Sequence, residues 1–414
     1  MEEYPKIIAV NGVQIALYPI KGLKAVAIST MIKAGSWYED GENWGKAHLL
    51  EHMMFQGTES FKDHDEMEIF KEENGIYSNA STGGPNIEVY MRMPGESLDK
   101  GLKLLEEMLF KLTIPEEALA KQKKVVTQEY EDRISRPNAR YWEKETEQNF
   151  GIGHVYDRDG IGKRVCFENA TRQELLDYAK KRFLPSNMFL AVAGNFDIAD
   201  IEEKLKLIFI VNEKKEEAEF AVVTPNYREL VHLEPGMSTA KVDIKWITKG
   251  LNEVSYEFRL KLWLAAYLLG GSPRSLLSKE IRERLGLAYS ISVSRSFYPT
   301  VGLFEVHTSV KRENVKKLIL EVKKIIKKLV EEPIDVSVFE RAKKYLIMQD
   351  AMSYESALGT ASSLSSSLFW YGRVATLEET EKILSGIGEE EVRSVLRAEV
   401  VNKEPMVSVM MSEG

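Results

Sequence analysis

The sequence predicts an α+β protein made of two homologous halves, each a mixed sheet packed with helices. Three observations predict this class. Short segments with strand patterning alternate with amphipathic helices along the chain of 414 residues. The order of these segments in the first half recurs in the second half. A polar, charged stretch without periodicity separates the two series.

The first half begins with strands and continues with helices. Ile7 to Ile20 alternates about the turn dipeptide Asn11-Gly12, which predicts a hairpin. Pro115 stands at the first position of a long helix that reaches about Ser135, with more helix following to Phe150. The other predicted strands are 25–32, 77–82, 87–93 and 188–194, and the other helices are 44–57, 65–74, 98–112, 171–183 and 198–208.

The second half repeats this order. A strand over 240–246 and a helix over 254–269 precede a short helix over 275–284 and a strand from Gly286. A strand over 302–309, a helix over 315–330 and a long helix after Pro333 follow. Duplication of one α+β unit is the simplest explanation. We therefore predict a first half over 1–212, a linker over 213–220 and a second half over 221–414.

Composition excludes several classes of protein. With 44% apolar and 29% charged residues, the chain is expected to be globular with a large core. A net charge of −8 without a basic stripe argues against nucleic acid as a partner. No apolar run has membrane-spanning length and no secretory signal is recognisable, so we expect no membrane partner and a cytoplasmic location. The single cysteine, Cys166, leaves histidines and carboxylates as the available metal ligands.

The most informative motif is His48-Leu49-Leu50-Glu51-His52, in a chain with only six histidines. Residues four apart share one face of a helix, so both imidazoles can point at one metal ion. Two neutral nitrogens beside a carboxylate suit a zinc ion that activates water, with Glu51 free to act as general base. This order of residues, H-x-x-E-H, is the inverted form of a zinc-protease motif.

A catalytic zinc ion needs a third protein ligand. Carboxylates of the helix that follows Pro115 are the natural candidates. Glu129 is favoured because it lies beside the apolar positions Val125 and Val126, and Glu131 is the remaining alternative.

The chain from about Gly45 to Asn212 resembles the pitrilysin/insulinase family of zinc peptidases, which includes the mitochondrial processing peptidases. The matching segments are 45–58, 79–82 and 125–129. The resemblance implies one zinc ion per chain, held by His48, His52 and Glu129. It also implies that two such α+β halves form a clamshell.

The resemblance assigns further roles, with one departure. Family members often carry a supporting glutamate seven residues before the third ligand, where this chain has Gln122, whose amide can still hydrogen-bond to a ligand. Arg282 and Tyr289 resemble an arginine and a tyrosine that reach the substrate from the half without metal. Asn79, Ala80 and Ser81 resemble the edge-strand segment that pairs with an extended substrate backbone.

These features together predict a zinc-dependent endopeptidase that hydrolyses unfolded or short peptides inside a closed chamber. The family's chamber usually uses four α+β units, so a chain with two implies a homodimer, with Arg282 and Tyr289 acting across the interface. Two alternatives stay open. One is a processing peptidase that makes a single defined cut, and the other is a non-catalytic peptide-binding subunit, for which Gln122 is the only indication.

Overall fold

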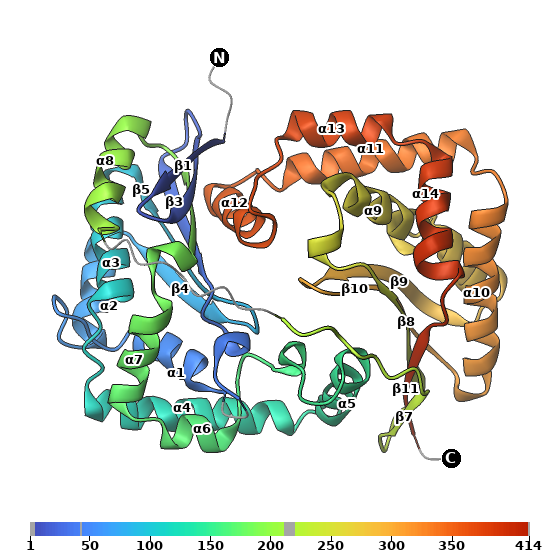
Figure 1. Cartoon of the computed structure of the whole chain (residues 1–414), viewed down its shortest axis with the longest axis horizontal. Coiled ribbons are helices and arrows are strands. Elements are labelled where there is room, and N and C mark those ends of the chain that lie inside the picture. The colour runs from blue at the N-terminus through green and yellow to red at the C-terminus, as the bar shows by residue number, and fades with distance from the viewer. Residues whose placement is uncertain (1–4, 42–43, 211–219, 413–414) are drawn as a thin grey trace. The chain divides into compact units, whose positions relative to one another are not determined.

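The structure, a computed structural model, describes residues 5–41, 44–210 and 220–412 (Figure 1). It divides into two compact units, each with its own sheet. Unit 1 contains the described residues within 1–135, 158–219 and 351–376, and unit 2 contains those within 136–157, 220–350 and 377–414. Each unit is a mixed sheet packed with helices, which confirms the predicted fold class.

Unit 1 is organised around a six-stranded sheet of order β1-β2-β6-β3-β5-β4. Neighbouring strands are antiparallel except for the parallel pair β2 and β6. The strands are β1 (Lys6–Val10), β2 (Val13–Pro19), β3 (Ala25–Ile32), β4 (Tyr77–Thr82), β5 (Ile87–Pro94) and β6 (Met188–Gly194). Its helices are α1 (Lys46–Met53), α2 (His64–Glu73), α3 (Leu98–Phe110), α4 (Glu116–Ile134), α6 (Arg164–Asn169), α7 (Arg172–Arg182), α8 (Ile198–Ile208) and α12 (Ala357–Tyr371).

Both faces of this sheet are buried, which explains why β6 is apolar along its whole length. Ile15, Ile28 and Val192 belong to the core on the side of α1 and α3. The alternate positions, such as Ala27 and Ala191, face α12 on the other side. Their small side chains let this helix lie close to the sheet (Figure 1).

Unit 2 has a five-stranded sheet of order β7-β11-β8-β10-β9. Its strands are β7 (Leu230–Leu233), β8 (Ala240–Thr248), β9 (Ala288–Phe297), β10 (Gly302–Val310) and β11 (Met406–Met411). Its helices are α5 (Ala139–Phe150), α9 (Tyr256–Gly270), α10 (Val315–Glu331), α11 (Val336–Met352), α13 (Leu377–Gly386) and α14 (Glu389–Leu396). No helix among the described residues is both long and apolar enough to cross a membrane.

The two sheets share one topology. The order β7-β11-β8-β10-β9 matches β2-β6-β3-β5-β4 strand for strand. In both series the first pair of strands is parallel, and all the remaining pairs are antiparallel. α1 and α9 occupy the same place in the two series, between the third strand and the edge strand. This correspondence supports the duplication inferred from the sequence.

The units differ from the contiguous halves expected from the sequence, because two segments are exchanged. Residues 136–157, which carry α5, belong to unit 2, and residues 351–376, which carry α12, belong to unit 1. Helical periodicity shows which face of a helix is apolar, but not which sheet it covers. The predicted linker over 213–220 lies outside the described residues except for Phe220.

α5 packs on its sheet through polar contacts. The Tyr141 hydroxyl donates to Asp243 Oδ2 at 2.5 Å, and Lys245 Nζ donates to Glu145 at 3.0 Å. His307 Nδ1 lies 2.6 Å from the other oxygen of Asp243. Burial alone would lower the pKa of His307, but the bond to Asp243 and the charge of Glu305 outweigh it and raise that pKa.

This raised pKa predicts that His307 stabilises the fold at low rather than high pH. The contribution is complete below about pH 6.5, the unfolded pKa, and is lost as pH rises through the higher folded value. His307→Gln should therefore lower the melting temperature by a few degrees at pH 6 and by less at pH 9. Circular dichroism melts would measure this, with His154→Gln in the same unit as control. An equal loss at both pH values would contradict the assignment.

Candidate metal centre

Helix α1 carries two of the predicted ligands. Its apolar face, including Leu49, Leu50 and Met53, is fully buried in the core of unit 1. His48 and His52 lie on another face with side chains only 14% and 15% exposed. The helix ends at Met53, earlier than the end near Gly57 expected from the sequence. Only the two turns that carry the motif are therefore helical.

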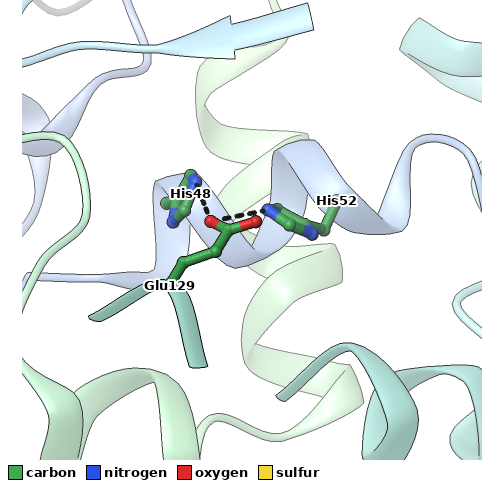
Figure 2. Close-up of side chains that lie close together, drawn as sticks. All are labelled: His48, His52 and Glu129. Atoms are coloured by element: carbon green, nitrogen blue, oxygen red, sulfur yellow. Dashed lines mark ion pairs between the residues drawn. The ribbon is translucent and has the colours of Figure 1, made fainter. Parts of the chain in front are cut away.

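Helix α4 brings the third predicted ligand to the same point. Val126 is buried in the core, and Glu129 lies one turn further on with a side chain 44% exposed. Glu129 Oε2 is 3.6 Å from Nε2 of His48 and 3.6 Å from Nε2 of His52 (Figure 2). Glu131 instead pairs with Arg164 at 2.9 Å. Of the two candidate carboxylates, Glu129 is therefore the one that lies beside the imidazoles.

The three side chains fit a zinc ion. Their candidate ligand atoms all lie within 4.8 Å of one another, and this is the only such group among the described residues. Tetrahedral zinc with bonds of about 2.0–2.2 Å places its ligand atoms about 3.3–3.6 Å apart, and the two separations of 3.6 Å between Glu129 and the imidazoles match this spacing. A separation of 3.6 Å is too long for a hydrogen bond. Burial, and then the charge of His52, lower the pKa of His48 to about 4, so its imidazole is neutral as a metal ligand must be.

Glu51 stands beside this group without joining it. Its Oε2 accepts a hydrogen bond of 2.9 Å from the Thr82 hydroxyl, at the end of β4. Burial raises the pKa of Glu51, while the neighbouring His52 and the bond from Thr82 oppose the rise. A carboxylate held in this way, next to the ligands but free of them, can accept and return a proton.

Gln122 supports one imidazole. It is buried on α4, and its Oε1 lies 3.1 Å from Nδ1 of His52. If Nδ1 donates to this amide oxygen, Nε2 keeps its lone pair facing Glu129. Nδ1 of His48 is buried without a hydrogen-bond partner among the described residues.

The predicted substrate-binding residues lie on β4, at the edge of the sheet. Asn79 and Ser81 are exposed, while Ala80 is buried against the core. Asn79 Oδ1 accepts a hydrogen bond from the Ala80 N–H at 2.9 Å. β4 is therefore an edge strand of the sheet that the described residues form, and it ends at Thr82 beside Glu51.

Arg282 and Tyr289 belong to unit 2. Arg282 lies in the helical turn Ser278–Arg284, and Tyr289 lies near the start of β9. The guanidinium carbon is 5.4 Å from the centre of the tyrosine ring, and Tyr289 is 86% exposed. The two side chains form one exposed cation–π pair, with donors available to a ligand.

Sequence reasoning missed two residues that contact this region. The sequence analysis gives Thr82 no role of its own, although its hydroxyl binds Glu51. It does not name Glu39, whose buried carboxylate contacts the first turn of α1. The sequence contains one signal for this role of Glu39. Gly45, at the N-cap position of α1, has no side chain that can cap the helix, and Glu39 is an acidic residue shortly before it.

Comparisons with known proteins give consistent matches. A model described as Insulinase (Peptidase family M16) matches residues 16–156, and one described as Peptidase M16 inactive domain matches 169–346. An uncharacterized zinc protease of Rickettsia felis is 27% identical, with 92% of this chain and 91% of the relative covered. The uncharacterized zinc protease YmxG of Bacillus subtilis is also 27% identical, with coverage of 94% and 93%. The mitochondrial-processing peptidase subunit beta of Bos taurus is 23% identical, with coverage of 97% and 82%.

Solved structures show the same fold. A peptidase M16 inactive domain from Pseudomonas fluorescens has a TM-score of 0.86 and 17% identity, with 99% of this chain and 98% of that chain covered. A protease from Helicobacter pylori has a TM-score of 0.83 and 19% identity, with 99% of both chains covered.

Removing the carboxylate that forms the third proposed ligand should abolish tight metal binding. Glu129→Gln keeps the size of the side chain but loses the charged ligand, so zinc affinity should fall by more than the roughly 10- to 100-fold that outer-shell changes cost. Competition with a chromogenic chelator would measure it. Glu131→Gln, on the same helix, is the matched control and should bind zinc like the wild type. Equal affinities in the two variants would rule out Glu129 as a ligand.

A carboxylate at position 122 should raise the zinc affinity of the centre, whereas Glu129→Gln should lower it. A carboxylate in Gln122→Glu would accept more strongly from Nδ1 of His52 and make Nε2 a better ligand. We expect zinc affinity to rise several-fold in this variant and to fall about 10-fold in Gln122→Ala, by the same chelator competition. The reverse order would show that the amide does not support His52.

Proposed function

Because the chain belongs to the insulinase (M16) family of peptidases, we propose that it is a zinc-dependent endopeptidase that hydrolyses unfolded or short peptides inside a closed chamber. The observation that carries the proposal is the approach of His48, His52 and Glu129 to a common point, with Glu51 left free beside them. A structural zinc site is normally closed by four protein ligands, whereas three ligands leave a position open for chemistry.

The side chains of the centre have separate roles in the proposed reaction. When bound, zinc lowers the pKa of water and polarises a carbonyl group. Glu51 accepts a proton from the attacking water and returns it to the leaving amine. The hydrogen bond from Thr82 holds the Glu51 carboxylate in place between these two transfers. Gln122 keeps His52 oriented throughout.

The substrate is proposed to bind as an additional strand at β4. Edge strands bind extended peptides through main-chain hydrogen bonds, which impose little preference for side chains. Asn79, Ala80 and Ser81 supply the edge, and Asn79 would release the Ala80 N–H to the peptide. Only a segment without structure of its own can pair in this way, so folded proteins should resist cleavage.

A non-catalytic peptide-binding subunit is the second candidate. The neutral Gln122, in place of the family's usual carboxylate, favours it, since the centre has one negative charge fewer near the metal. A purified protein that holds zinc but cleaves no peptide would favour this candidate.

Glu51→Gln should separate proton transfer from metal binding. The amide preserves shape and can keep the contact with Thr82, but it cannot accept a proton. We expect kcat to fall by about 10²–10⁴, with zinc content unchanged. A quenched fluorogenic peptide would report cleavage, with Glu131→Gln as a charge-matched control. Unchanged activity in Glu51→Gln would defeat the catalytic assignment.

We propose that the active form is a homodimer in which Arg282 and Tyr289 of one copy donate to the developing oxyanion at the other copy's centre. Mixing Arg282→Ala with Glu51→Gln should then restore part of the activity that each lacks alone, because one mixed site is intact. The measurement is peptide cleavage after co-incubation. Absence of any rescue would place both sets of residues within one chain's site.

A further inference from the structure

The first turn of α1 is capped from outside the helix. Gly45, at the N-cap position, has φ of +141° and no side chain that could bind the first N–H groups. The carboxylate of Glu39 takes this place. It accepts from the N–H of Gly45 at 2.9 Å, of Lys46 at 2.8 Å and of Ala47 at 3.2 Å. Three of the four unsatisfied donors of the helix thus meet one side chain.

Glu39 is an unusual acid because it is only 6% exposed. Burial raises the pKa of its carboxyl, and the three N–H bonds and the charge of Lys46 oppose this rise. A negative charge is favourable at the positive end of a helix. A helix of eight residues is too short to be stable alone, so its order depends on contacts such as this one.

The backbone around Glu39 is itself held. Arg158 donates to the carbonyl oxygens of Glu39 at 2.7 Å and Gly41 at 2.6 Å, and its guanidinium lies 5.3 Å from the ring of Trp44. A Cβ on Gly162 would lie 2.2 Å from Cα of Gly45, so the chain passes too close to the helix start for any residue other than glycine. The cap therefore has little freedom to follow the helix if the helix shifts.

These contacts end one residue before the first proposed metal ligand. Ala47, the last donor to Glu39, directly precedes His48. Because α1 has only two turns, rotation of its first turn would move both imidazoles relative to Glu129, which comes from another helix. We infer that Glu39 is a positioning residue of the metal centre: its buried carboxylate fixes the start of α1 and thereby the direction of His48 and His52. This inference rests on the proposed zinc site, but not on catalysis.

Glu39→Gln tests the inference. An amide keeps one oxygen acceptor, but its NH₂ group would face an N–H donor of the helix. We expect zinc affinity to fall by about 10- to 100-fold, the range for residues that orient ligands. The visible absorption of the cobalt-substituted protein should also change, because it reports ligand geometry. If Glu39→Gln does not fold, Glu39→Asp keeps the charge, withdraws it by one methylene and should weaken zinc binding in the same direction.

The control is a helix cap that is remote from the metal. Asp197 caps α8 in the same unit by accepting from the N–H of Asp200 at 2.9 Å. Asp197→Ala should cost thermal stability, as the loss of a cap does, yet leave zinc affinity and the cobalt spectrum unchanged. If both variants lost stability equally and neither changed zinc binding, Glu39 would be an ordinary cap and the inference would fail.

Hydrogen exchange of the metal-free protein separates this inference from the proposed function. Amides of residues 46–53 should exchange faster in Glu39→Gln than in wild type, whether or not the protein is a peptidase. A wild type that binds zinc tightly, depends on Glu39 for it and cleaves nothing would overturn the proposed function alone. Unchanged exchange together with unchanged zinc affinity in Glu39→Gln would overturn the inference alone.

Discussion

The proposed metal centre depends on the contact between α1 and α4, two helices of unit 1 that pack against each other. Leu49, Leu50 and Met53 anchor one face of α1 in the core. This packing fixes the orientation of the helix and therefore the direction in which its polar face points. α4 is anchored nearby through Leu119 and Val126. Because both anchors are apolar and fully or almost fully buried, the position of the ligands is set by close packing rather than by the metal. The fold can thus prepare the site before an ion binds.

The two sheets share one topology, but the helices at equivalent places in the two units differ. The helix between the third strand and the edge strand is short and polar on one face in unit 1, where it carries His48 and His52. Its counterpart α9 is longer, and apolar residues such as Leu264 and Ala265 fill it. The same scaffold therefore supports a polar centre in one copy and an additional core helix in the other.

α12 and α5, the helices of the two exchanged segments, each pack on the sheet of the other half of the sequence. α12 covers the sheet of unit 1 with apolar side chains such as Leu364 and Leu368. α5 meets the sheet of unit 2 through Tyr141, Glu145 and Gln148, each bonded to a polar group of a strand. Apolar contacts are insensitive to pH, whereas the network around Asp243 includes His307, whose pKa is raised by its bond to Asp243 and by the charge of Glu305. α12 also bonds to its sheet through Ser365, whose hydroxyl lies 2.7 Å from that of Ser29, so polar contacts are common to both helices.

Features that depend on neighbours along the chain can be predicted from the amino-acid sequence alone. Helical periodicity places His48 and His52 on one face, turn residues mark the first hairpin, and the order of segments reveals the repeat. Tertiary packing decided the rest. It placed Glu129 rather than Glu131 beside the imidazoles, and it placed the Glu39 carboxylate at the start of α1. It also assigned α5 and α12 to sheets on the other side of the predicted linker. Contacts between distant segments depend on how apolar faces pack in three dimensions. Sequence periodicity predicts which face of a helix is apolar, but it does not predict which element that face packs against.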